Sequence, residues 1–120
     1  SEAELLESAI GRLEIIRSYG TGAVEVKSGY GLTVEGELKM LRVIRKLKEH
    51  TNLTIKSTFL GAHTYPFEFK NNHEGYIKKI TDEMLPQIAD EGLADFIDVF
   101  CDEGFFSPDE AKRILEAGVK

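Results

Sequence analysis

The sequence contains a single cysteine, Cys101, and has neither a CxxC motif nor a Cys/His cluster. An internal disulfide is therefore excluded, and so is a structural zinc site built on cysteine pairs. Proline is also scarce, with 3 residues, while 42% of the residues are hydrophobic and 30% are charged. This composition excludes a disordered chain and predicts a folded globular protein.

The sequence also lacks long apolar runs and an excess of positive charge. No apolar run approaches the roughly 18 to 20 residues that span a bilayer, and the amino terminus lacks the layout of a signal peptide. We therefore expect no membrane partner and a cytosolic location. The 15 basic and 21 acidic residues are interspersed and give a net charge of -6, so no nucleic-acid partner is expected either.

What the sequence does contain is an alternation of helical and strand patterns. Apolar residues recur at helical spacing in residues 1–20, in the segment that follows Thr33, in residues 74–91 and after Ser107. Short runs rich in β-branched residues predict strands within AVEVKSGYG, LTIKSTFLGA and DFIDVFCDEG. The third strand is interrupted only by Asp98, which is typical of a strand buried on both faces.

Local signals predict where several helices begin or break. Thr33 can cap the second helix, and Ser107, Pro108 and Glu110 form a strong start for the last one. Pro86 lies inside the pattern of residues 74–91 and is expected to kink or divide that helix.

The order helix, strand, helix, strand, helix, strand, helix predicts an α/β fold made of parallel β/α units. A closed barrel needs about 250 residues, whereas the chain has 120. Three strands would also leave two open sheet edges. We therefore predict a partial (β/α)8 TIM barrel, with about three strands and an N-terminal helix.

In parallel α/β folds, ligands bind beyond the carboxyl ends of the strands, which here carry KSGYG, GAHTYPFEF and CDEGFF. Tyr30 could donate a hydrogen bond to a carboxylate or carbonyl, or it could simply pack in a tight turn. His63 could contact substrate, bind a metal or hold its loop, and the first role is favoured. Lys27 could pair with an anion, but a structural ion pair with Glu25 or another carboxylate is favoured, and His50 and His73 are expected at the surface.

The segment after the third strand has more open roles. A buried, inert thiol is favoured for Cys101. Glu103 could act as a base, form an ion pair at the rim or cap a helix, and its spacing to other residues does not choose between these roles. Phe105 and Phe106 are expected to wedge the loop against the sheet rather than to bind ligand.

Taken in order, VEVKSGYGLTVEGELKMLRVIRKL, TFLGAH and ADFIDVFCDEGFFSPDEAKRILEAG resemble the central part of the imidazolonepropionases, amidohydrolases of histidine degradation. The resemblance implies a metal-dependent hydrolase, with zinc or iron, that opens the ring of 4-imidazolone-5-propanoate with water and yields N-formimidoyl-L-glutamate. In that family the tyrosine of SGYG and the histidine of GAH contact substrate. The resemblance thus assigns substrate-binding roles to Tyr30 and His63.

The resemblance also implies what residues 1–120 lack as a fragment of such a TIM-barrel domain. The family's metal ligands are an early His-x-His pair, a later histidine and a later aspartate, and none of these segments is in the chain. No catalytic or metal-binding residue is therefore expected here, and the isolated fragment is expected to be inactive. The expected partners are a small-molecule substrate and, for the full-length parent, a second copy in a homodimer.

Two alternatives remain open at this point. The chain could be a self-contained small α/β module that binds a ligand or oligomerises through its open edges. It could also come from an amidohydrolase that acts on another cyclic amide, because loops set specificity on a shared barrel.

Overall fold

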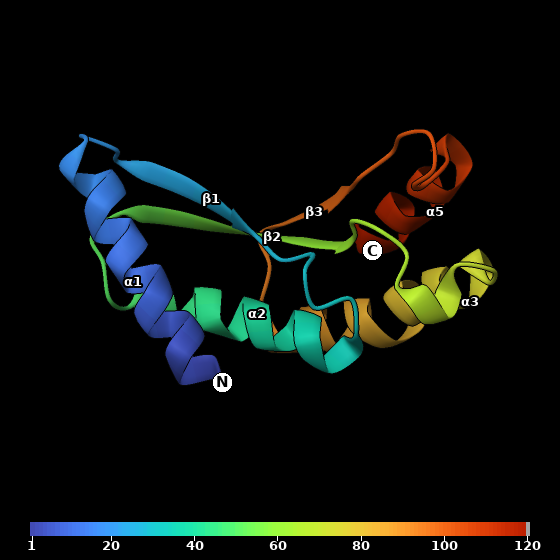
Figure 1. Ribbon diagram of the computed structural model, residues 1–120, viewed down its shortest axis with the longest axis horizontal. Helices are drawn as coiled ribbons and strands as arrows, with labels where there is room; N and C mark the ends of the chain where they lie inside the picture. Colours follow the sequence, from blue (N-terminus) through green and yellow to red (C-terminus); the bar gives the residue numbers. More distant parts are fainter. Residues whose placement is uncertain (120) are drawn as a thin grey trace.

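The computed structural model describes residues 1–119 and contains three strands with helices between and around them (Figure 1). The elements are α1 (Glu2–Ser18), β1 (Ala23–Lys27), α2 (Val34–Lys48), β2 (Thr54–Ala62), α3 (His73–Lys78), α4 (Leu85–Glu91), β3 (Phe96–Val99) and α5 (Pro108–Gly118). A short 3-10 turn, Phe67–Phe69, precedes α3, and a π-helix, Lys79–Met84, joins α3 to α4. None of the helices within residues 1–119 is both long and apolar enough to cross a membrane.

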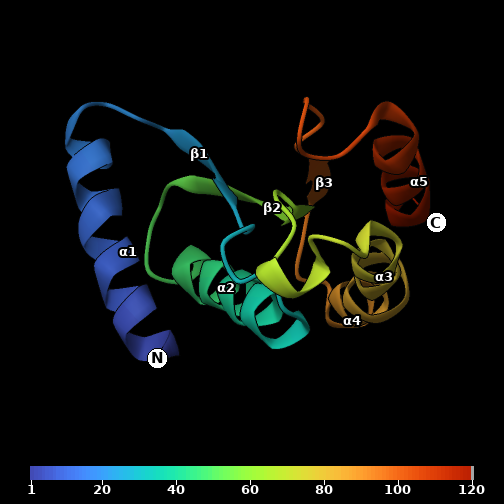
Figure 2. The ribbon, with the colours of Figure 1, turned by 45° about the vertical axis from the view of Figure 1, so that its right-hand side comes forward.

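The three strands form one parallel sheet in the order β1-β2-β3. Helices α2, α3 and α4 lie on one side of this sheet, α1 packs beside α2, and α5 packs against β3 (Figures 1 and 2). Because β1 and β2 are each followed by a helical segment and then by a parallel neighbouring strand, the arrangement is a run of β/α units. The predicted α/β class with a parallel sheet is confirmed.

The core lies between the central strand β2 and the helices beneath it. Leu41 of α2, Phe59 of β2 and Ile80 of the π-helix are all essentially inaccessible to solvent. The buried Tyr76 hydroxyl donates a hydrogen bond of 2.7 Å to the carbonyl of Gly61. Burial raises the pKa of the Tyr76 phenol, so this group stays a donor at neutral pH and ties α3 to the end of β2.

The predicted helix starts are confirmed in detail. The Thr33 hydroxyl accepts a hydrogen bond of 3.0 Å from the Gly36 N–H at the start of α2. At α5, Ser107 and Glu110 form a reciprocal capping box, in which each side chain accepts from the other residue's backbone N–H.

Pro86 divides its helix, as predicted. The Leu85 N–H bonds to the carbonyl of Ile80, five residues back, and this bond closes the π-helix. Pro86 has no N–H to continue the ladder, so a new helix, α4, starts at this point.

The prediction that the third strand is buried on both faces is wrong for this chain. The side chain of Phe96 is 54% exposed, and the other residues of β3 are only half-buried. β3 has a single partner strand, and Phe96 lies on the face of β3 opposite Ile97, which packs against Gly118 of α5, so that within residues 1–119 the Phe96 face is left uncovered. Its apolar residues therefore lack the second layer that the sequence pattern implies.

The uncovered face of the sheet carries charged side chains that pair across the strands. Lys27 donates to Asp98 at 2.7 Å and also lies 3.6 Å from Glu25. The bond to Asp98 is the main cause of the raised pKa of Lys27 and the lowered pKa of Asp98. The predicted structural ion pair of Lys27 is confirmed, with Asp98 as its principal partner.

Asp95, directly before β3, is expected to contribute to the free energy of unfolding, and acid is expected to remove this contribution. Its carboxylate accepts from the Ser57 N–H at 2.8 Å and from Lys48 at 3.0 Å, and these bonds hold its pKa well below the ordinary value of 3.8. Because the folded-state pKa is the lower one, the stabilisation is complete above the unfolded-state pKa. It is lost as the pH falls from there toward the folded-state pKa.

This contribution can be measured by urea unfolding of the protein and of its Asp95→Asn variant at a series of pH values. The urea midpoints are expected to differ most at neutral pH and to converge as the pH falls below about 4. A difference that stays constant down to acidic pH would contradict this role for the carboxylate.

Candidate functional site

The segment Ser28–Leu32, which we call the glycine loop, leaves the carboxyl end of β1 and is fixed to β2 at its first residue. The Ser28 N–H donates to the carbonyl of Thr58 at 3.0 Å, and the Ser28 hydroxyl accepts from the Leu60 N–H at the same distance. Ser28 is completely buried. The loop therefore begins from a rigid position beside the end of β2.

The rest of the glycine loop wraps around the carboxylate of Glu37, which projects from the first turns of α2. This carboxylate accepts backbone hydrogen bonds from Gly29 at 2.9 Å, Gly31 at 2.9 Å and Leu32 at 3.0 Å. Glu37 is fully buried, and within residues 1–119 no salt bridge reaches it. Backbone donors alone satisfy its oxygens.

The burial of Glu37 beneath the glycine loop was not predicted, although the position of Glu37 in the apolar pattern of α2 indicates it. In α2, Glu37 precedes Leu41 by four residues and Ile44 by seven, so it lies on the apolar stripe of that helix. A carboxylate on a buried stripe needs donors, and the nearest unpaired donors in the sequence are those of the preceding glycine-rich turn.

Two glycines are required by the path of the loop. Gly29 has a φ of +103°, and a Cβ at this position would lie 2.7 Å from the carbonyl oxygen of Leu60. Gly31 passes so close to α2 that a Cβ would meet the backbone of Gly36 and Glu37. Any side chain at either position would push the loop away from its neighbours.

The loop brings together the two residues that were predicted to bind substrate. The rings of Tyr30 and His63 meet edge to face, with centroids 5.3 Å apart. His63 Nδ1 lies 2.8 Å from the carbonyl oxygen of Gly29. Since a carbonyl only accepts, Nδ1 must carry the hydrogen, and Nε2 is left for other partners. The Tyr30 side chain is 77% exposed and so is accessible to a ligand.

The end of the third strand reaches the same place. The ring of Phe100 meets His63 edge to face, with centroids 5.9 Å apart, and it also meets Phe105 edge to face, with centroids 4.6 Å apart. Side chains that follow all three strands thus converge at one edge of the sheet. There the ring of His63 contacts the rings of Tyr30 and Phe100.

Other residues after β3 do not join this cluster. The prediction of a buried thiol is wrong, because Cys101 is exposed in the turn beyond the end of the strand. Asp102 and Glu103 are exposed as well: the Asp102 carboxylate accepts from the Glu103 N–H at 2.8 Å, and the Asp102 carbonyl accepts from the Phe105 N–H at 3.1 Å. Phe106 does wedge the loop: it is fully buried and stacks on Tyr65, with centroids 4.3 Å apart.

The remaining histidines lie apart from His63 in the contacts that the structure describes. His50 is exposed and its Nδ1 bonds to the carbonyl of Lys46, while His73 is exposed at the start of α3 and stacks on Tyr65. Among the described residues, no three His, Cys, Asp or Glu side chains come together in a way that could hold a metal ion.

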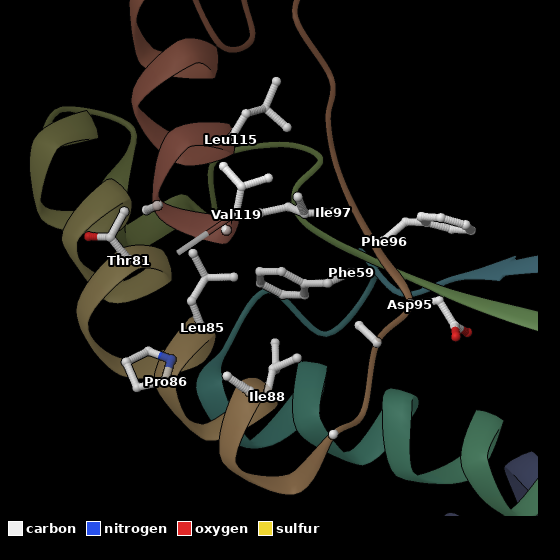
Figure 3. Close-up of a pocket in the computed structure, with 15 residues that line it drawn as sticks. Phe59, Thr81, Leu85, Pro86, Ile88, Asp95, Phe96, Ile97, Leu115 and Val119 are labelled. Carbon is white, nitrogen blue, oxygen red and sulfur yellow. The ribbon is translucent and has the colours of Figure 1, made fainter.

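A groove of about 670 Å³ lies on another part of the molecule, between α4, β3 and α5 (Figure 3). Its walls are mostly apolar and include Leu85, Ile97 and Leu115. Neither Tyr30 nor His63 lines it. The groove is thus separate from the cluster at the strand ends.

Comparison with known proteins identifies the relatives of this chain, although no protein-family model matches it. The chain is 58% identical over 120 residues to the imidazolonepropionase of Flavobacterium psychrophilum and 57% identical over 119 residues to that of Flavobacterium johnsoniae. The enzyme of Thermoanaerobacter pseudethanolicus is 48% identical over 120 residues. These matches cover 99–100% of the chain but only 29% of each relative. The predicted resemblance is thereby confirmed: along its whole length the chain is similar to one segment of the imidazolonepropionases.

Proposed function

We propose that this chain is the substrate-binding segment of a metal-dependent imidazolonepropionase, which hydrolyses 4-imidazolone-5-propanoate to N-formimidoyl-L-glutamate. The observation that carries the proposal is the 48–58% identity to enzymes of that name over the whole chain. The adjacency of Tyr30 and His63 beyond the carboxyl ends of parallel strands supports it, because this is where α/β enzymes bind ligands.

The two side chains offer complementary hydrogen-bonding groups to such a substrate. The Tyr30 hydroxyl can donate to the propanoate carboxylate or to the ring carbonyl. With its Nδ1–H held by the Gly29 carbonyl, His63 presents Nε2, which accepts from a ring N–H when neutral and donates to a carboxylate when protonated. Both groups orient the substrate rather than attack it.

The metal, zinc or iron in this proposal, is expected to be held by segments of the full-length enzyme other than this one, as the family resemblance implies. When bound, such a metal activates a water molecule for attack on the ring. No step of the reaction is assigned to a metal held by this chain. Closure of the sheet into a TIM barrel by further strands, a cytosolic location and a homodimer remain predictions.

The alternatives are less well supported. A self-contained binding module does not account for the identity to enzymes more than three times as long as the chain. An amidohydrolase for another cyclic amide would share the sheet, but the relatives that cover 99–100% of the chain carry the name imidazolonepropionase.

The proposal is tested with Tyr30→Phe and His63→Ala in the full-length enzyme. We expect kcat/KM for imidazolone propanoate to fall about tenfold in the first and about a hundredfold in the second, since each variant loses a hydrogen bond to a charged or polar substrate group. The loss should lie mainly in KM. His50→Ala, which removes an exposed histidine that bonds only to its own helix, is the matched control. Wild-type kcat/KM in both site variants would refute the assignment.

A further inference from the structure

We propose that Glu37 is a positioning residue, which holds the glycine loop so that His63 presents Nε2 to the substrate and Tyr30 keeps its place beside it. The inference rests on the proposed substrate-binding roles of Tyr30 and His63. It extends them to a residue that touches neither substrate nor metal and acts through the loop backbone alone.

Burying the Glu37 carboxylate is costly unless its oxygens are hydrogen-bonded. Glu37 has no exposed surface, and in the described part of the chain only backbone N–H groups reach its oxygens. A buried carboxyl group is tolerated only when hydrogen bonds replace its hydration, and bonds to a carboxylate are stronger than neutral ones. The loop conformation and the burial of Glu37 therefore depend on each other.

Gly29 connects Glu37 to the imidazole of His63. Gly29 donates its N–H to the Glu37 carboxylate and accepts the Nδ1–H of His63 at its carbonyl oxygen. The carboxylate thus fixes the residue whose carbonyl selects the hydrogen-bearing nitrogen of His63. If the loop shifted, Nδ1 would lose its acceptor and both tautomers of the ring would become populated.

Tyr30 lies in the sequence between two of the three residues whose N–H groups donate to the Glu37 carboxylate. Gly29 and Gly31 both bond to Glu37, so the backbone is fixed on either side of Tyr30. Leu32, the third donor, holds a φ of +52°, which a non-glycine residue rarely adopts without support. The hydrogen bond from the Leu32 N–H to the Glu37 carboxylate stabilises this strained backbone conformation.

The test uses Glu37→Gln in the full-length enzyme, with Glu35→Gln as the control. Both residues lie in the first turns of α2 and carry the same charge, but Glu35 is exposed. Glutamine keeps the shape of Glu37 while replacing one acceptor oxygen by a donor, which then faces the Gly29 N–H. We expect KM to rise about tenfold with kcat changed less than about threefold, and the control to match the wild type.

Two further measurements separate positioning from a general structural role. Nitrogen NMR of the substrate-free enzyme should show His63 protonated at Nδ1 in the wild type and a mixture of tautomers in Glu37→Gln. In a Tyr30→Phe/His63→Ala background, Glu37→Gln should raise KM less than about twofold further, because the groups it positions are absent. If Glu37→Gln does not fold, Glu37→Asp, which shortens the reach of the carboxylate, is measured in the same way.

The outcomes distinguish this inference from the function on which it rests. Wild-type KM in Tyr30→Phe and His63→Ala would overturn the proposed function itself. If those variants are impaired but the Glu37 variant keeps both the wild-type KM and the wild-type His63 tautomer, only the positioning role is overturned. It is also overturned if the full KM effect of Glu37→Gln persists in the double-variant background.

Discussion

Replacing Phe106 by alanine is expected to cost about 3–5 kcal/mol of folding free energy, as is typical of a fully buried phenylalanine. Phe106 has no exposed surface and stacks on Tyr65 at 4.3 Å between ring centroids. Its N–H also bonds to the carbonyl of Phe100, which closes the turn after β3. Removing the ring would leave a cavity between this turn, α5 and the loop that precedes α3.

Phe105 provides the matched control for this prediction. It is the neighbouring phenylalanine, but it is 37% exposed and its described ring contact is with Phe100. Phe105→Ala should therefore cost only about 0.5–1.5 kcal/mol, the usual value of an aromatic pair. Urea or thermal unfolding of both variants measures the two losses. Equal losses would show that the ring of Phe106 does not anchor the turn.

Gly29→Ala is expected to cost about 3 kcal/mol or more and to disrupt the Tyr30 and His63 cluster. At a φ of +103° any L-residue is strained, and the new Cβ would lie 2.7 Å from the Leu60 carbonyl oxygen and 3.2 Å from the Cβ of His63. The loop must then move away from β2. This movement would break the bond between His63 and the Gly29 carbonyl, so KM should rise along with the loss of stability.

Gly104→Ala separates the two causes of that effect. Gly104 also has a positive φ, +79°, but a Cβ there would have no atom within 4 Å. It should therefore suffer only the backbone strain, about 1 kcal/mol, with no change in KM. Comparing the unfolding free energies of the two variants isolates the steric part. If Gly29→Ala were no worse than Gly104→Ala, the close approach of the loop to β2 would not be what requires glycine.

Some features of the fold could be predicted from the sequence and others could not. The helices and strands could be predicted because their signals are local. Thr33 and Ser107 bond to backbone groups three residues away, and Pro86 breaks the hydrogen-bond ladder of its own helix. Tyr30 and His63 could be singled out because strand ends are recognisable before any contact is known.

The environments of individual side chains were less predictable. The apolar pattern of β3 suggested burial on both faces, yet Phe96 is exposed, because burial depends on what covers an edge strand and not on its own residues. Cys101 was expected inside for its chemical character, but it is exposed, directly before the turn that follows β3. Neither error could be corrected by a closer inspection of the sequence pattern.

The alternation of helices and strands, the parallel sheet and the strand-end position of the candidate ligand-binding residues follow from local signals, because periodicity, caps and connection lengths act over short distances along the chain. Which of these residues meet is a property of the folded protein. The contact between Tyr30 and His63 spans two strands, and the burial of Glu37 beneath the glycine loop joins a helix to the turn before it. Such contacts depend on the packing of separate elements and on the path of the backbone between them, which no local pattern specifies.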